Sequence, residues 1–166
     1  VAPMSLIISS FARAEDVRKT LTPQLRTDKG DTDLIYIDLG ERKGRLGASA
    51  LSQVYRQLGN KPADLENASR LKGLFDAIQL AYHDISDGGL FTAVAEMAFA
   101  GHTGVSVTLD QLNQDNLRAL FSEELGAVIQ VKREDKEKVL NILSGHGLAN
   151  ISFVIGALRD DDRIVF

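Results

Sequence analysis

Apolar and polar positions alternate along the chain in a way that predicts a regular succession of strands and helices. Short apolar, partly β-branched runs predict strands at 5–11, 34–39, 80–83, 105–109, 127–131, 151–158 and 163–166. Apolar residues at i, i+3, i+4 and i+7 predict helices at 51–58 and 71–78, and further helices are expected at 15–21, 90–100, 115–121 and 135–143. Because strands and helices alternate through the second half with short connections, we expect an α+β fold in which helices cover a mixed sheet.

Composition narrows the class of protein. The 166 residues are one domain's length and suffice for a hydrophobic core without staples. With 19 basic and 23 acidic residues, the net charge of −4 offers no basic surplus for nucleic acid or an anionic membrane. The absence of cysteine excludes thiol catalysis and disulfides, and no apolar run is long enough to span a membrane. Since the sequence starts without methionine and stops within an expected strand, we expect a piece of a longer polypeptide.

The richest candidate site is the sequence HDISDGG, which we call the HDISDGG turn (His83–Gly89), between an expected strand and helix. Asp84 or Asp87 could give a hard oxygen ligand to Mg²⁺, and the glycines and helix N–H groups could receive a phosphate. Ser86 adds a hydroxyl beside them. The alternative is that Asp87 only caps the helix while the glycines allow tight packing, so that the turn binds nothing.

A second candidate is the glycine-rich loop Gly44–Ser49, which matches neither a phosphate-binding P-loop nor a dinucleotide fingerprint. Lys43 and Arg45 could still attract a phosphate there. Ser49 after a glycine turn is more typical of a helix cap, so we expect it to begin the helix at 51–58.

Three further groups have structural interpretations. Glu123 and Glu124 could form an acid/base pair, but adjacent residues do not face each other, so solvated charges are expected. The acidic run 160–162 could bind Ca²⁺, although a polar hairpin turn is the better prediction. Met97 and Phe99 are expected to pack in the core or in an interface.

A family resemblance is carried by several of these segments. HDISDGGL followed by AVAEMAFAG resembles the signature of the C-terminal subdomain of the aminoimidazole ribonucleotide synthetase superfamily. With SLIISSFARAEDVRKTLTPQL, GASALSQVYRQLGNKPAD and LFSEELGAVIQV, it is similar to the large single-chain formylglycinamidine ribonucleotide synthetases (phosphoribosylformylglycinamidine synthases). The resemblance covers essentially all of 1–166. It implies a single C-terminal subdomain of the second synthetase-like repeat, with that superfamily's partly ferredoxin-like fold.

The same resemblance implies an ATP-dependent ligase of purine biosynthesis. Such enzymes activate formylglycinamide ribonucleotide by phosphoryl transfer, and ammonia from glutamine then displaces the phosphate. The second repeat is expected to hold an auxiliary nucleotide, ATP or ADP, with Mg²⁺. Here Asp84 would be the metal ligand and Ser86 the nucleotide contact, with no catalytic residue in this chain.

The partners implied are the remainder of the same polypeptide, in the cytoplasm: the N-terminal half of the repeat, the catalytic repeat and the cysteine-dependent glutaminase domain. The sequence departs from the family pattern in two respects. Fewer residues than in the family lie between the helix expected to end near Gln79 and the strand that carries His83, as though residues were missing between Gln79 and Leu80. The family's other metal ligands and nucleotide-binding residues lie in the N-terminal half of the repeat. The alternatives are a structural docking module that binds no ligand and, less favoured, a free-standing small α+β enzyme.

Overall fold

A computed structural model describes residues 8, 9, 11, 13, 16, 20–77, 82–112 and 115–166. The strand expected at 5–11 and the helix expected at 15–21 fall mainly outside these residues, and so does the junction of Gln79 with Leu80. Among the residues described, no helix is both long and apolar enough to cross a membrane.

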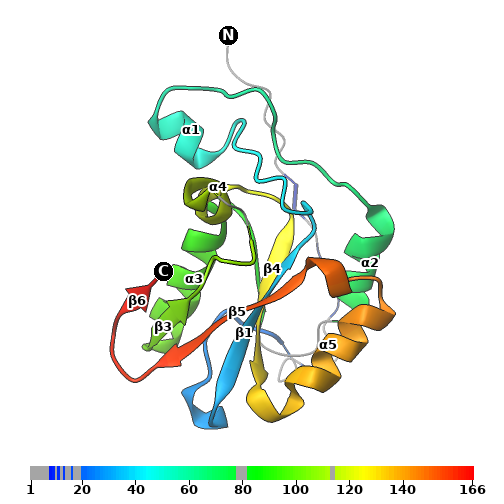
Figure 1. Ribbon diagram of the computed structural model, residues 1–166, viewed down its shortest axis with the longest axis vertical. Coiled ribbons are helices and arrows are strands. Elements are labelled where there is room, and N and C mark those ends of the chain that lie inside the picture. Colours follow the sequence, from blue (N-terminus) through cyan, green and yellow to red (C-terminus); the bar gives the residue numbers. More distant parts are fainter. Residues whose placement is uncertain are drawn as a thin grey trace.

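A six-stranded mixed sheet in the order β2-β4-β1-β5-β3-β6 lies at the centre of the described structure (Figure 1). Its strands are β1 (Thr32–Asp38), β2 (Tyr82–Asp84), β3 (Gly104–Val107), β4 (Gly126–Lys132), β5 (Ser152–Arg159) and β6 (Ile164–Val165). Neighbouring strands are antiparallel except β3 and β6, which are parallel. The mixed sheet expected from the sequence is therefore confirmed.

Five helices lie in the described part of the chain: α1 (Ala50–Val54), α2 (Ala68–Ala77), α3 (Gly89–Gly101), α4 (Asn116–Phe121) and α5 (Lys136–Gly145). Three short 3-10 turns lie among the described residues: Thr27–Lys29 before β1, Arg133–Asp135 between β4 and α5, and Ala149–Ile151 between α5 and β5. Figure 1 shows α3 and α4 on one side of the sheet and α2 and α5 on the other, with α1 near one end. Helices thus cover the sheet, as the alternating sequence pattern predicts, and they lie on both of its faces.

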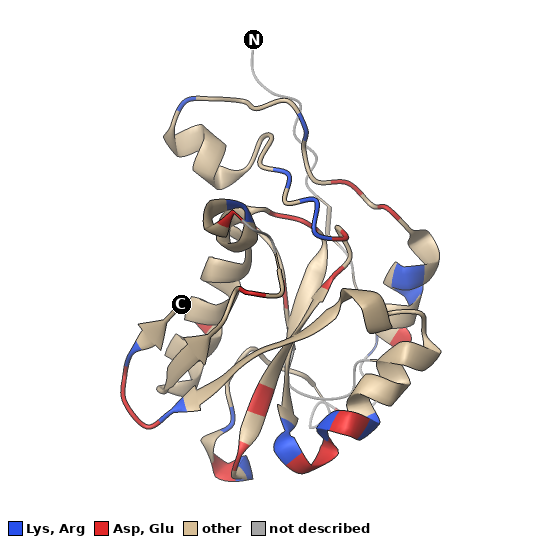
Figure 2. Ribbon diagram, viewed as in Figure 1, with Lys and Arg blue, Asp and Glu red and all other residues tan. Residues whose placement is uncertain are grey.

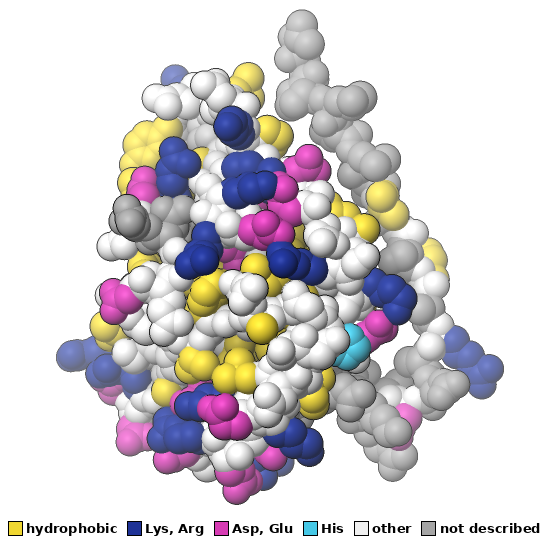
Figure 3. Space-filling model, turned by 45° about the vertical axis from the view of Figure 1, so that its right-hand side comes forward, with side chains coloured by type: hydrophobic (Ala, Val, Ile, Leu, Met, Phe, Trp, Pro, Cys, Tyr) yellow, Lys and Arg dark blue, Asp and Glu magenta, His cyan; other side chains and the backbone are white. Residues whose placement is uncertain are grey.

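The central strand β1 is buried along its whole length, and its side chains alternate between two hydrophobic clusters. Leu34 and Tyr36 join the cluster under α3 and α4, whereas Ile35 and Ile37 join the cluster under α2 and α5. The charged residues are mostly in loops and at the ends of elements (Figure 2). On the face in Figure 3, acidic and basic side chains lie beside one another with hydrophobic side chains between them.

Helix α3 is apolar on nearly every side because it packs against the sheet and against α4. Met97 is completely buried, which confirms that it packs in the core. Phe99, two residues along the helix, is instead 70% exposed and faces away from the core.

The prediction of a helix over 51–58 is wrong beyond its first turn. Helix α1 ends at Val54, because Arg56 adopts a left-handed conformation with a φ of 55°, which breaks the helical hydrogen-bond pattern. The apolar side chains whose spacing suggested a buried helical face, Val54, Tyr55 and Leu58, are 70–77% exposed. This apolar stripe therefore lies on the surface of the described structure.

The prediction of a hairpin at the acidic run 160–162 is also wrong. Strands β5 and β6 both pair with β3, one on each side, so the turn passes over β3 instead of joining adjacent strands. Within it, Asp161 accepts from Arg159 at 2.6 Å, and this hydrogen bond lowers the pKa of Asp161 to about 2. The acidic turn is thus partly neutralised by its own neighbour.

Candidate functional site

The HDISDGG turn runs from the end of β2 to the first residue of α3, at the edge of the sheet. Ile85 is buried in the core, and its N–H donates to the carbonyl of Gly126 at 3.0 Å. Asp84 and Ser86 flank it and are both exposed, the Asp84 side chain to 63%. Because successive side chains of an extended segment point to opposite sides, the buried Ile85 turns both oxygen-bearing neighbours outward. The two residues predicted as ligands thus share one accessible side of a fixed turn.

The glycines of the turn serve packing, as the structural alternative predicts. Gly89 has a φ of 69°, and a Cβ there would lie 2.6 Å from the backbone oxygens of Leu120 and Ser122. Asp87 is not the helix cap, because the N-cap is Gly88 in a left-handed conformation with no side-chain cap hydrogen bond. The predicted capping is therefore wrong, whereas the close approach through glycine is confirmed.

The backbone N–H groups of both glycines are already used inside the molecule. Gly88 N donates to Oε1 of Glu123 at 2.9 Å, and Gly89 N donates to the carbonyl of Ser86 at 3.0 Å. For these two amides, the prediction that N–H groups at the helix start point outward toward a phosphate is wrong. A ligand at the turn would be recognised by the side chains of Asp84 and Ser86 instead of these two amides.

His83 holds the other end of the turn, a role that the sequence analysis missed. Its Nδ1 donates to the carbonyl of Asp84 at 2.7 Å, and its Nε2 lies 2.7 Å from a carboxylate oxygen of Glu96 on α3. The His83 side chain is only 12% exposed. It therefore ties the Asp84 backbone to the helix that follows the turn.

The donor set of the turn fits part of a magnesium site. Magnesium is commonly bound through one or two carboxylates together with substrate phosphates and water, and Asp84 offers one accessible carboxylate of this kind. No group of three or more His, Asp or Glu side chains comes together as a metal site within the described residues. The turn can thus supply one ligand to a metal held mainly by a nucleotide.

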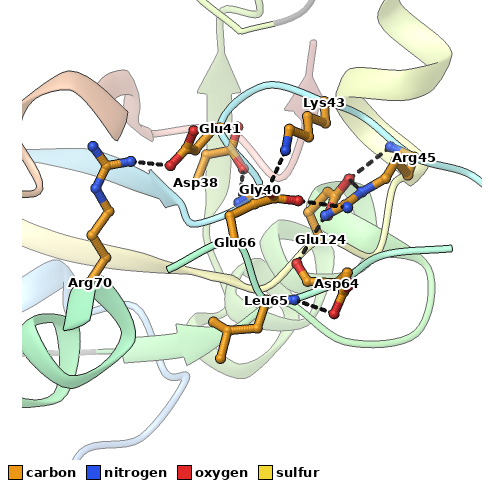
Figure 4. Close-up of polar contacts among 10 residues, drawn as sticks. All are labelled: Asp38, Gly40, Glu41, Lys43, Arg45, Asp64, Leu65, Glu66, Arg70 and Glu124. Atoms are coloured by element: carbon orange, nitrogen blue, oxygen red, sulfur yellow. Dashed lines mark hydrogen bonds and ion pairs between the residues drawn. The ribbon is translucent and has the colours of Figure 1, made fainter. Parts of the chain in front are cut away.

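The loop after β1 is held by a network of ion pairs around Arg45 (Figure 4). Arg45 forms a bidentate pair with Glu124, with Nε–Oε1 and Nη2–Oε2 distances of 2.7 and 2.6 Å. It also donates to Glu66 and to the carbonyl of Asp64, at 2.7 and 2.9 Å, and Lys43 pairs with Glu66. Hydrogen bonding to Glu124 raises the pKa of Arg45. The two cations considered for phosphate binding are therefore engaged by carboxylates.

The structural interpretation of this loop is confirmed at its end. Ser49 is the N-cap of α1, and its Oγ accepts a hydrogen bond from the N–H of Ser52 at 3.3 Å. Its own hydroxyl donates to the carbonyl of Leu46. Ser49 thus begins the helix as predicted, although that helix is short.

The expectation that Glu123 and Glu124 are both solvated is wrong. The Glu124 side chain is 1% exposed because Arg45, which is 79 residues away in sequence, encloses it. Glu123 is half-buried, and its Oε1 accepts from Gly88 N and from Ala50 N. The two neighbours point to different partners, so they do not form an acid/base pair.

Asp38, at the end of β1, organises the first turn of the same loop. One carboxylate oxygen accepts from Gly40 N at 2.9 Å and the other from Arg42 N at 2.6 Å. These bonds hold Glu41 and Arg42 in left-handed conformations. Arg70, on α2, forms an ion pair with Glu41 (Figure 4). Burial raises the pKa of Asp38 in spite of these two backbone donors.

Replacing Asp38 by asparagine is expected to lower the free energy of unfolding by about 1–3 kcal/mol, because the amide NH₂ must face one of the two N–H donors. Asp38 takes up its proton at a higher pH in the folded than in the unfolded chain. Wild type should therefore gain stability relative to Asp38→Asn as the pH falls through that range. Urea denaturation at several pH values measures both effects, and a pH-independent difference contradicts the assignment.

Together, the mixed sheet, the helices on both faces and the turn between β2 and α3 define a C-terminal domain of the aminoimidazole ribonucleotide (AIR) synthase type. Residues 37–166 match the family described as "AIR synthase related protein, C-terminal domain", and the chain belongs to this family.

Solved structures with the same fold include two kinds of protein. E. coli HypE, a hydrogenase maturation protein, aligns with a TM-score of 0.59 and 23% identity, over 87% of this chain and 48% of that one. T. maritima PurL complexed with FGAR aligns with a TM-score of 0.62 and 17% identity, over 87% of this chain and 26% of that one. The complex of T. maritima PurL with ATP aligns with a TM-score of 0.60 and 17% identity, over 87% of this chain and 24% of that one. At these identities the likeness shows the fold, and this chain spans about half of HypE and a quarter of PurL.

Proposed function

We propose that this chain is the C-terminal subdomain of a synthetase-like repeat in a formylglycinamidine ribonucleotide synthetase. In this proposal it contributes to an auxiliary nucleotide–Mg²⁺ site. The family match over 37–166 supports it, and so do the PurL structures of similar fold that are complexed with ATP and with ADP. The observation that carries the site is the exposed pair Asp84 and Ser86, held outward by the buried Ile85 on a turn fixed at both ends.

Each side chain of this pair has a distinct role in the proposal. Asp84 offers a carboxylate to the metal, and the bound Mg²⁺ would offset the negative charge of the nucleotide phosphates. Ser86 offers a hydroxyl that can donate to a phosphate oxygen. The remaining contacts would come from the N-terminal half of the repeat, within a cytoplasmic polypeptide that also carries the catalytic repeat and the glutaminase domain.

A second candidate function is a structural docking module whose turn binds no ligand. It is favoured by the hydrogen bonds of Gly88 and Gly89, because these amides already have partners within the chain. The two functions differ in whether the exposed Asp84 and Ser86 contribute to nucleotide affinity.

Replacing Asp84 by alanine in the full-length protein that contains this chain is expected to lower its affinity for Mg²⁺·ADP by about 10–100-fold, since a metal contact is lost. Calorimetric titration measures this change, and Asp160→Ala, which removes an exposed carboxylate elsewhere, should leave the affinity unchanged. Binding by wild type with equal affinity in Asp84→Ala and Ser86→Ala contradicts the site. No binding by wild type supports the docking module instead.

A further inference from the structure

One oxygen atom of Glu123 joins two segments that are distant in sequence. Its Oε1 accepts from the N–H of Gly88, in the HDISDGG turn, at 2.9 Å. The same atom accepts from the N–H of Ala50, the first residue of α1, at 2.7 Å. Hydrogen bonds to a charged acceptor are about twice as strong as neutral ones, so this atom is a strong tether between α1 and the turn.

The segment that carries Glu123 is itself fixed on both sides. Before it, the carbonyls of Leu120 and Ser122 lie against Gly89, so closely that no side chain fits at that glycine. After it, Glu124 is buried in its bidentate pair with Arg45. The carboxylate of Glu123 therefore reaches the turn from a rigid base.

The turn has few other attachments in the described structure between Ile85 and the start of α3. Ile85 N donates to Gly126 O, Gly88 N donates to Glu123, and within the turn Gly89 N donates to the carbonyl of Ser86. The exposed Ser86 and Asp87 lie between Ile85 and Gly88. The bond from Gly88 to Glu123 thus connects the part of the turn that presents the Ser86 hydroxyl to a distant segment, in addition to the bond from Gly89 to Ser86 within the turn.

We propose that Glu123 is the positioning residue of this site, fixing the Ser86 side of the turn relative to α1 through Gly88 and Ala50. This inference rests on the proposed nucleotide site and assigns Glu123 a role in its geometry without contact to the nucleotide. Since a single oxygen accepts both hydrogen bonds, the amide oxygen of glutamine can replace it, whereas alanine cannot.

Glu123→Ala is therefore expected to lower the affinity of the full-length protein for Mg²⁺·ADP by about tenfold, because the charged hydrogen bond that positions Gly88 is lost. It should also speed amide hydrogen exchange at Gly88 by about tenfold or more. Glu123→Gln should restore both properties to within about threefold of wild type. Glu134→Ala, which removes a 75% exposed carboxylate paired with Lys132, is the control and should change neither.

Each outcome decides the inference. Unchanged affinity or unchanged exchange at Gly88 in Glu123→Ala overturns it, and so does equal loss in the alanine and glutamine variants, which would point to charge alone. If wild type does not bind Mg²⁺·ADP, the proposed function fails, and the positioning of Ser86 for a nucleotide fails with it. Exchange at Gly88 would then show only whether Glu123 tethers the turn.

Discussion

Replacing Glu124 by alanine is expected to lower the free energy of unfolding by about 3–5 kcal/mol, because it breaks a buried ion pair. The variant leaves the Arg45 guanidinium, whose side chain is 12% exposed, without its bidentate partner. It also removes the acceptor of the Arg45 backbone N–H and opens a cavity against Gly40, whose Cα is packed on the Glu124 side chain. Urea denaturation of the purified protein measures this loss.

Glu66→Ala is the matched control, because Glu66 pairs with the same arginine but its side chain is 22% exposed. Its cost should be about 1 kcal/mol or less, as for other solvent-accessible pairs. An equal cost for the two variants would contradict the expectation that the buried Glu124 pair contributes more to stability than the more exposed Glu66 pair of the same network.

Gly89→Ala should lower the free energy of unfolding by about 2–5 kcal/mol. The left-handed φ of 69° strains any residue with a side chain, and the added Cβ would meet the backbone oxygens of Leu120 and Ser122 at 2.6 Å. Backbone atoms at this distance cannot move aside without shifting α4 against α3. Because Gly89 begins α3, the same variant should also disturb the HDISDGG turn.

The control for this change is Gly145→Ala at the end of α5. A Cβ there meets no heavy atom within 4 Å, and the residue has no positive φ. Alanine should therefore leave stability unchanged or raise it by up to about 1 kcal/mol. A Gly89→Ala variant as stable as Gly145→Ala would show that the close packing of the turn on α4 is absent in solution.

The mixed sheet and most of its helices could be predicted because their signals are local. The apolar run of β1 and the nearly continuous apolar surface of α3 each reflect burial on more than one side. The apolar spacing at 51–58 predicted too long a helix. The left-handed conformation of Arg56, which stops α1 from continuing past Val54, leaves no trace in that spacing. The pairing of β6 with β3 was missed because strand order depends on contacts between distant segments.

The candidate site could be predicted only in part, for the same reason. The residue types and spacing of Asp84 and Ser86 mark the turn in the sequence, and the structure places both on one accessible side. The partners of Glu123 and Glu124 lie in the turn, in α1 and in the loop after β1. Adjacent glutamates in a sequence give no sign of such different surroundings, because burial and pairing are set by tertiary contacts.

The central claim is that the HDISDGG turn holds a metal-bound nucleotide. It is tested most directly by NMR of the full-length protein that contains this chain, with Mn²⁺·ADP added in place of Mg²⁺·ADP. The paramagnetic ion broadens the signals of nearby nuclei, so the position of the metal is read from the residues affected. We predict that Mn²⁺·ADP broadens the amide signals of Asp84, Ile85 and Ser86 first, and that Asp84→Ala abolishes this effect. Broadening centred elsewhere in the protein, or unchanged in Asp84→Ala, would contradict the claim.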